Sequence, residues 1–169
     1  AWYISMKCFV VCQNEFLIRL LANTLPSPFE VEFIVDDEQL AHRLLDGDIS
    51  VRVGNPNRVD TYLRAGVDPV TCVLVEDCTR SSTRRTTEAI RDAGGNLIYL
   101  LDVGQTHSPN HGEPSGDRTP GTTRLAVADL LRGNLCAELE RSMTRARVEQ
   151  YQRYLADADR VLILLHNEP

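Results

Sequence analysis

Short apolar runs alternate with amphipathic stretches through residues 7–101. Each run has the length of a buried strand, and the stretches between them place apolar side chains three or four positions apart, as Leu17, Leu20 and Leu21 do. Strands that alternate with helices are typical of a parallel sheet covered on both faces. The pattern therefore predicts an α/β, Rossmann-like doubly wound parallel sheet. The predicted strands are residues 8–12, 31–35, 51–53, 72–75 and 97–101.

In such sheets ligands bind at the carboxyl ends of the strands, near the point where the strand order reverses. Polar residues follow four of the predicted strands, and each strand-to-helix turn also needs polar groups to cap the helix that follows. Capping by Asp37, Asn57, Thr79 or Ser81 is thus an alternative to ligand binding. The candidate ligand-binding residues are Cys12, Gln13, Asn14, Asp36, Asp37, Asn55 and Asp77.

The turn after the first strand lacks the three glycines of a dinucleotide-binding loop. Cys12, Asn14 and Leu17 fill the three positions. Asn14 is a residue that tolerates a left-handed conformation, so we expect the turn itself to survive. Glu15 places a negative charge where a diphosphate would meet the helix, which predicts weak dinucleotide binding in the usual pose. Asp36, about twenty residues on, is placed to accept ribose hydroxyls.

The chain changes character after the fifth strand. Residues 104–123 hold no apolar side chain and predict a flexible loop, in which His107 and His111 are expected to be solvated rather than a metal pair. Residues 124–159 are expected to form a connecting segment, with a short strand or helix at 125–132 and a long charged helix at 135–158. The apolar stripe of that helix predicts core packing or a dimer seam.

Composition narrows the functional classes. A formal charge of −6 argues against binding of nucleic acid through a general positive field. Four arginines nevertheless lie on one predicted helix, either as a face exposed to solvent or as a contact for an anion or a partner: Arg80, Arg84, Arg85 and Arg91. No apolar stretch is long enough to cross a bilayer, so no membrane insertion is expected. The five cysteines show neither metal spacing nor a disulfide framework, which favours a reducing cytoplasm and leaves catalytic thiol chemistry improbable.

Two segments resemble a known family. Asp36, residues 51–56 (Val-Arg-Val-Gly-Asn-Pro) and residues 63–67 (Leu-Arg-Ala-Gly-Val) together resemble the RCK N-terminal (TrkA-N) domain over residues 7–103. That family shows Gly-Asp-Ala-Thr after its third strand and Leu-x-x-Ala-Gly-Ile on the next helix. The resemblance implies a Rossmann fold, a regulatory role in potassium channels and transporters, binding of NAD, ATP or another adenine nucleotide such as AMP, and a homodimer.

The final residues resemble a second family. Residues 161–169, ending in His166-Asn167-Glu168-Pro169, resemble the opening strand of DHH phosphoesterases, in which His-x-x-Pro precedes Asp-x-Asp. This resemblance implies that residues 160–169 are the first strand of a truncated catalytic domain, with His166 as one ligand of a divalent metal such as manganese. The remaining ligands would lie beyond Pro169, so we expect no catalysis by residues 1–169.

These expectations combine into one hypothesis and its rivals. The leading hypothesis is a non-catalytic, nucleotide-sensing or regulatory TrkA-N-like domain of a cytoplasmic DHH phosphoesterase. The alternatives are a degenerate Rossmann module kept only for dimerisation, and a regulatory subunit of a potassium transport system. A nicotinamide dehydrogenase is the weakest alternative, because the glycines are missing and no His or Lys occupies a plausible hydride-transfer position.

Overall fold

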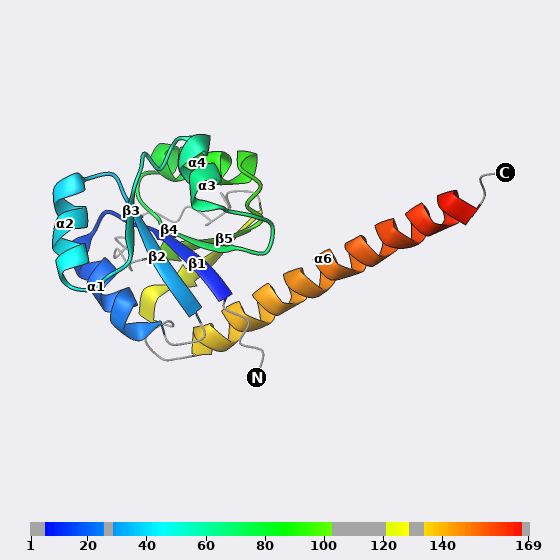
Figure 1. Ribbon diagram of the computed structural model, residues 1–169. Coiled ribbons are helices and arrows are strands. Elements are labelled where there is room, and N and C mark those ends of the chain that lie inside the picture. The colour runs from blue at the N-terminus through cyan, green and yellow to red at the C-terminus, as the bar shows by residue number, and fades with distance from the viewer. Residues whose placement is uncertain (1–5, 26–28, 103–120, 129–133, 167–169) are drawn as a thin grey trace, which may run out of the picture.

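A computed structural model describes residues 6–25, 29–102, 121–128 and 134–166, without the side chains of 134–138, 159 and 161–166. Strands and helices alternate, as the sequence predicts (Figure 1). The strands are β1 (Met6–Val11), β2 (Phe29–Val35), β3 (Val51–Val53), β4 (Cys72–Glu76), β5 (Leu97–Asp102) and β6 (Thr122–Ala126). The helices are α1 (Glu15–Thr24), α2 (Glu38–Asp46), α3 (Val59–Ala65), α4 (Arg80–Asp92) and α6 (Asn134–His166).

All six strands are parallel, in the order β3-β2-β1-β4-β5-β6. The order reverses between β1 and β4, whose register pairs Cys8 with Cys72 and Val11 with Val75. The predicted α/β, Rossmann-like class is therefore confirmed. The carboxyl ends of β1 and β4 lie side by side at the sheet centre, where this class of fold places ligands.

Alternate residues of each strand enter two separate cores, because successive side chains of a strand point to opposite faces. On one face, Val10, Phe33 and Leu74 pack with the buried sides of α1 and α2. On the other face, Phe9, Val73 and Leu100 belong to a cluster with residues of α3 and α4. Both faces are thus covered, which is why the strands read as continuous apolar runs.

The sheet continues beyond the predicted domain end at residue 103. β6 pairs with β5 in register from Ile98 with Thr122 to Asp102 with Ala126, so Thr122 and Thr123 are strand residues and not part of a loop. Composition misled here because β6 is an edge strand, in which Leu125 is the one buried residue and the others face solvent at least in part. Residues 103–120, with His107 and His111, lie outside the described residues, as do the first five residues.

The predicted long helix is confirmed but reaches further than expected. α6 runs for 33 residues, and Leu139 and Met143 are buried in the same core as α1 and α2. Its later turns project away from the domain (Figure 1). The predicted strand at residues 161–165 is wrong, because α6 continues to His166. A short apolar run cannot be assigned to strand or helix by its pattern alone, and here it prolongs a helix already formed.

Candidate functional site

Gln13 connects the ends of three neighbouring strands. Its side-chain Oε1 accepts a hydrogen bond from the backbone N–H of Asp36 after β2 (2.9 Å). Its own backbone N–H donates to Oε2 of Glu76 at the end of β4 (3.1 Å). The structure therefore brings two of the predicted residues, Gln13 and Asp36, into direct contact. It also adds Glu76, which the sequence analysis did not select because neighbouring strands cannot be identified from one sequence.

Asn14 has a different role from the one predicted for it. Its backbone is extended, with φ −88°, rather than left-handed. Its Oδ1 accepts a hydrogen bond from the N–H of Leu17 (3.1 Å), so Asn14 is the N-cap of α1. Leu17 stands at the third glycine position and is buried in the core beside α1. The Asn14 amide oxygen thus occupies an N–H that a dinucleotide-binding loop would offer to phosphate, while Leu17 packs into the core where the third glycine would allow close helix–strand packing.

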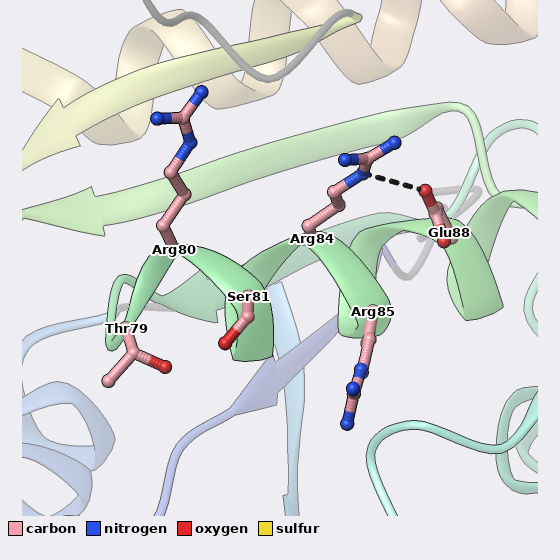
Figure 2. A pocket seen from close by; sticks show the side chains of 6 residues that line it. All are labelled: Thr79, Arg80, Ser81, Arg84, Arg85 and Glu88. Carbon is pink, nitrogen blue, oxygen red and sulfur yellow. Dashed lines mark hydrogen bonds and ion pairs between the residues drawn. The ribbon is translucent and has the colours of Figure 1, made fainter.

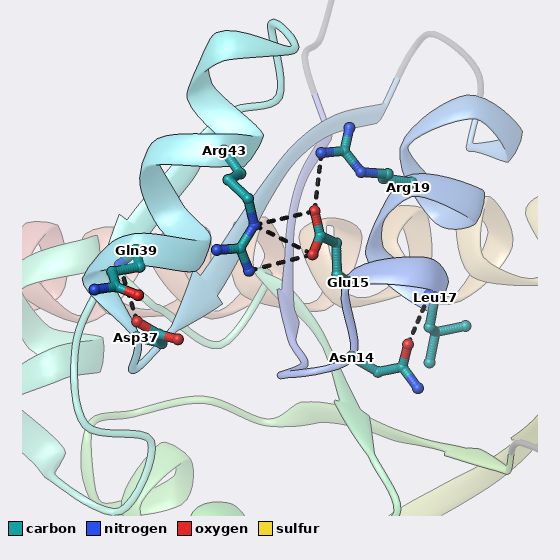
Figure 3. A network of polar contacts seen from close by, with 7 residues as sticks. All are labelled: Asn14, Glu15, Leu17, Arg19, Asp37, Gln39 and Arg43. Atoms are coloured by element: carbon teal, nitrogen blue, oxygen red, sulfur yellow. Dashed lines mark hydrogen bonds and ion pairs between the residues drawn. The ribbon is translucent and has the colours of Figure 1, made fainter.

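Glu15 forms ion pairs with two arginines, so its negative charge is partly neutralised. Its Oε1 pairs with Nη2 of Arg19 (3.0 Å) and its Oε2 with Nη2 of Arg43 of α2 (3.2 Å). Figure 3 shows the carboxylate between the two guanidinium groups, in the space between α1 and α2. Hydrogen bonds from Arg19 and then Arg43 lower the pKa of Glu15. The expected repulsion of a diphosphate is therefore largely offset, and the filled turn is the stronger obstacle.

Asp36 and Asp37 differ although they are adjacent. Oδ1 of Asp37 accepts from the N–H of Gln39 (2.9 Å), which makes Asp37 the N-cap of α2 (Figure 3). The Asp36 side chain is exposed, and within the described part of the chain its carboxylate has no hydrogen-bond or ion-pair partner. The capping alternative is thus correct for Asp37, while Asp36 keeps both oxygens for a ligand.

The turn after β3 is stabilised by its own side chains. Oδ1 of Asn55 accepts from the N–H of Asn57 (2.9 Å), and Asn57 in turn accepts from the Thr86 hydroxyl of α4 (3.1 Å). Asn57 does not cap α3 as predicted, because the helix begins one residue later with Arg58 at the N-cap. Gly54 is required here, since a Cβ would lie 2.6 Å from Cγ2 of Thr61.

Asp77 belongs to the β4 side of the edge. Its Oδ1 accepts from the Thr83 hydroxyl of α4 (3.2 Å), and its Oδ2 pairs with Arg124 of β6. Thr83 also accepts from the N–H of Cys78 (3.1 Å), and Thr79 caps α4 as predicted. Arg124 was not anticipated, because the pairing of β6 with β5 cannot be identified from the sequence. Asp77 is therefore satisfied by the protein itself.

Cys12 is buried at the end of β1, and its Sγ donates to the carbonyl oxygen of Asn14 (3.7 Å). Burial first, and then the Glu76 charge, raise the pKa of the Cys12 thiol. Burial and the same carboxylate also raise the pKa of Cys78, which is exposed to solvent. Neutral thiols are poor nucleophiles and poor metal ligands, so neither cysteine is primed for chemistry.

Three arginines stand at the start of α4, beside the carboxyl end of β4. Arg80, Arg84 and Arg85 line an open hollow of about 670 Å3 with Thr79, Ser81 and Glu88 (Figure 2).

Within the described residues, no group of three His, Cys, Asp or Glu side chains is arranged to hold a metal ion. No helix in that same part of the chain is long and apolar enough to cross a membrane.

Comparison with known proteins assigns no family to this chain. No family model and no curated protein matches the chain. One similar solved structure is described as a structural and functional study of chuY from E. coli strain CFT073, with a TM-score of 0.42 and 15% identity. The match covers 58% of this chain and 48% of that one, so this chain spans about half the length of that protein.

Proposed function

We propose that this chain is a non-catalytic sensing domain that binds the ribose of an adenine nucleoside or mononucleotide at the carboxyl end of β2. The observation that carries the proposal is the exposed Asp36 carboxylate, which has no partner among the described residues. A carboxylate at this place in a Rossmann-like fold accepts hydrogen bonds from ribose hydroxyls. The neighbouring Asp37 is already used as a helix cap.

The filled turn after β1 favours a ligand without a bridging diphosphate. Asn14 takes the N–H of Leu17, which would otherwise face a phosphate. Gln13 crosses from β1 to the N–H of Asp36 and closes the gap between the two strand ends. Adenosine and AMP need less of this space than NAD, so they are the ligands that the geometry supports best.

The direct test is calorimetric titration with adenosine, AMP and NAD. We expect adenosine and AMP to bind more tightly than NAD, and Asp36→Asn to weaken adenosine by about tenfold or more, since an amide offers one acceptor oxygen in place of a carboxylate. Asp37→Asn is the matched control, because asparagine caps helices as well as aspartate does. Tight NAD binding, or equal adenosine binding by Asp36→Asn, would refute the proposal.

The protein that this domain regulates is proposed to be a DHH phosphoesterase that uses a divalent metal such as manganese. The support is the His166-Asn167-Glu168-Pro169 motif in the sequence. The strand that the family shows before this motif is a helix here, so the motif alone supports the proposal. The parent chain should hydrolyse a phosphoester with manganese, and adenosine should change that rate in the parent but not in its Asp36→Asn variant.

A role in dimerisation is the second candidate function. Val148, Tyr151, Tyr154 and Leu155 are 50–65% exposed on the projecting part of α6. Val148, Tyr151 and Leu155 follow the three- and four-residue spacing of a helix–helix seam. A second copy of the chain covering this seam would give a homodimer.

Light scattering on a Val148→Asp/Leu155→Asp variant tests that role. The expected result is a dimer for the unaltered protein and a monomer for the variant. Leu63→Asp is the control, since Leu63 is equally exposed (58%) on α3 and should leave the mass unchanged. A monomeric unaltered protein, or a dimer that survives in the variant, would contradict a dimer seam on α6.

A further inference from the structure

The carboxylate of Glu15 occupies an anion position between α1 and α2. Nη2 of Arg19 lies 3.0 Å from its Oε1, and Nη2 and Nε of Arg43 lie 3.2 Å and 3.3 Å from its Oε2. In Figure 3 one guanidinium group reaches the carboxylate from α1 and the other from α2. Both carboxylate oxygens are therefore engaged. Arg43 binds Glu15 through two neighbouring donors, which form the edge that would hold a phosphate.

The place of Glu15 in the first turn of a helix accounts for only part of this arrangement. Asp60 lies in the first turn of α3 and pairs with Arg64, four residues on (3.0 Å). Such an acid is favoured by the positive end of the helix and by the pair along the same helix. Glu15 differs because a second arginine, Arg43, reaches it from another helix, 28 residues away in the chain. A network of three charges contributes more than an isolated exposed pair.

The Glu15 network joins the same two parts of the fold as the proposed ribose position does. The Gln13 side chain bonds to the N–H of Asp36 between the ends of β1 and β2. Glu15, two residues after Gln13, pairs with Arg43 between the helices that follow these strands. In a Rossmann-like fold, a ligand whose ribose is bound at the end of the second strand places its phosphate at the start of the first helix. Glu15 already carries a negative charge there.

We propose that Glu15 makes the site at Asp36 select an unphosphorylated nucleoside over the corresponding nucleotide. This inference rests on the proposed function, because it concerns the ligand of the same site. A phosphate would bind the paired donors of Arg43 only by displacing the Glu15 carboxylate, which would remain beside it as a like charge. A neutral nucleoside needs none of these donors and leaves the network intact.

Calorimetric titration of the unaltered protein and of Glu15→Gln with adenosine and with AMP tests this role. We expect the unaltered protein to bind adenosine more tightly than AMP. Glu15→Gln should shift the ratio of the two dissociation constants by about tenfold or more in favour of AMP, because the donors of Arg43 become free for the phosphate. Adding Arg43→Gln to Glu15→Gln should abolish this shift, whereas adenosine should bind all three proteins alike.

Asp60→Asn is the matched control, because it makes the same change in charge and also frees an arginine one turn along a helix. Its ratio of dissociation constants should equal that of the unaltered protein. An unchanged ratio in Glu15→Gln, or an equal shift in Asp60→Asn, would overturn the role of Glu15.

Titration with pyrophosphate distinguishes failure of this inference from failure of the ribose site. Glu15→Gln should bind pyrophosphate more tightly than the unaltered protein and Asp60→Asn do, since the two arginines bind an anion without a ribose. Adenosine binding that depends on Asp36, with no gain in pyrophosphate binding by Glu15→Gln, would refute the role of Glu15 and leave the ribose site standing. A gain in pyrophosphate binding without any adenosine binding would refute the ribose site and its selectivity, and would support only the anion position.

Discussion

The turns after β1 and β4 lie side by side at the centre of the sheet, yet the helices that follow them begin with residues of opposite charge. After β1, Asn14 caps α1 and the acidic Glu15 is the first residue of the helix. After β4, Thr79 caps α4 through a longer bond and the helix begins with Arg80. In a dinucleotide-binding fold the first of these turns would hold phosphate. The two turns therefore differ in the charge with which the following helix begins, and neither repeats the glycine-rich turn of a dinucleotide-binding fold.

The largest expected change in stability in this comparison comes from substitution of Thr83, a buried residue that bonds to the turn after β4. Thr83→Val removes the hydroxyl that joins Oδ1 of Asp77 to the N–H of Cys78, so both of these atoms lose that partner. Oδ2 of Asp77 keeps its ion pair with Arg124. We expect a loss of about 1–3 kcal/mol in the free energy of unfolding, measured by urea denaturation.

Thr87→Val is the control, because Thr87 is also buried but its hydroxyl donates only to a carbonyl of its own helix, that of Arg84. If both variants lose the same stability, the anchoring role of Thr83 is wrong.

A smaller effect is expected from the caps of the two helices. Asn14→Ala should cost about 1 kcal/mol, because the N–H of Leu17 loses its acceptor. Thr79→Ala should cost less, since its cap bond to Ser82 is 3.4 Å long against 3.1 Å for Asn14. Urea denaturation of both variants measures the difference. An equal or greater loss of stability for Thr79→Ala would show that the longer cap bond of Thr79 is not the weaker one.

The smallest effect concerns the pH dependence of Glu15. Its pKa is lowered in the folded protein, so its ion pairs contribute stability above the unfolded-state pKa of about 4.3, and that contribution is lost as the pH falls through the folded-state pKa. Titration by nuclear magnetic resonance should place the pKa of Glu15 below that of an ordinary glutamate, and Arg43→Gln should raise it. A Glu15 pKa that Arg43→Gln leaves unchanged would mean that the ion pair does not form in solution.

The sequence was sufficient for the fold because the buried strands carry continuous apolar runs. Val10, Leu74 and Leu100 all lie in such runs, and each is buried. The start of β6 was assigned to the loop because Thr122 and Thr123 have the composition of one, whereas its end overlaps the short strand or helix expected from Leu125. Residues 161–165 were assigned to a strand, although an apolar run of this length suits either a strand or a helix.

The candidate site could be predicted as a place, but the use of each side chain could not. Gln13, Asp36 and Asp77 follow the carboxyl ends of predicted strands, where a ligand is expected to bind. This expectation does not require knowing which strands are adjacent. Whether a carboxylate caps a helix or stays available depends on one bond. Asp37 and Asp36 are adjacent in the chain, and only the Asp37 carboxylate accepts a cap bond, from the N–H of Gln39. This difference in hydrogen bonding is visible in the structure but cannot be predicted from the residue types.

The most direct test of the account is a titration of the 15N-labelled protein with adenosine, followed by the backbone amide signals. The account predicts that the largest shifts occur at the amides of Gln13 and Asp36, with little change from Arg80 to Arg85. An Asp36→Asn variant should need about tenfold more adenosine, or more, for the same shifts. Shifts confined to the start of α4, or none at all at saturating adenosine, would contradict a ribose site at the end of β2.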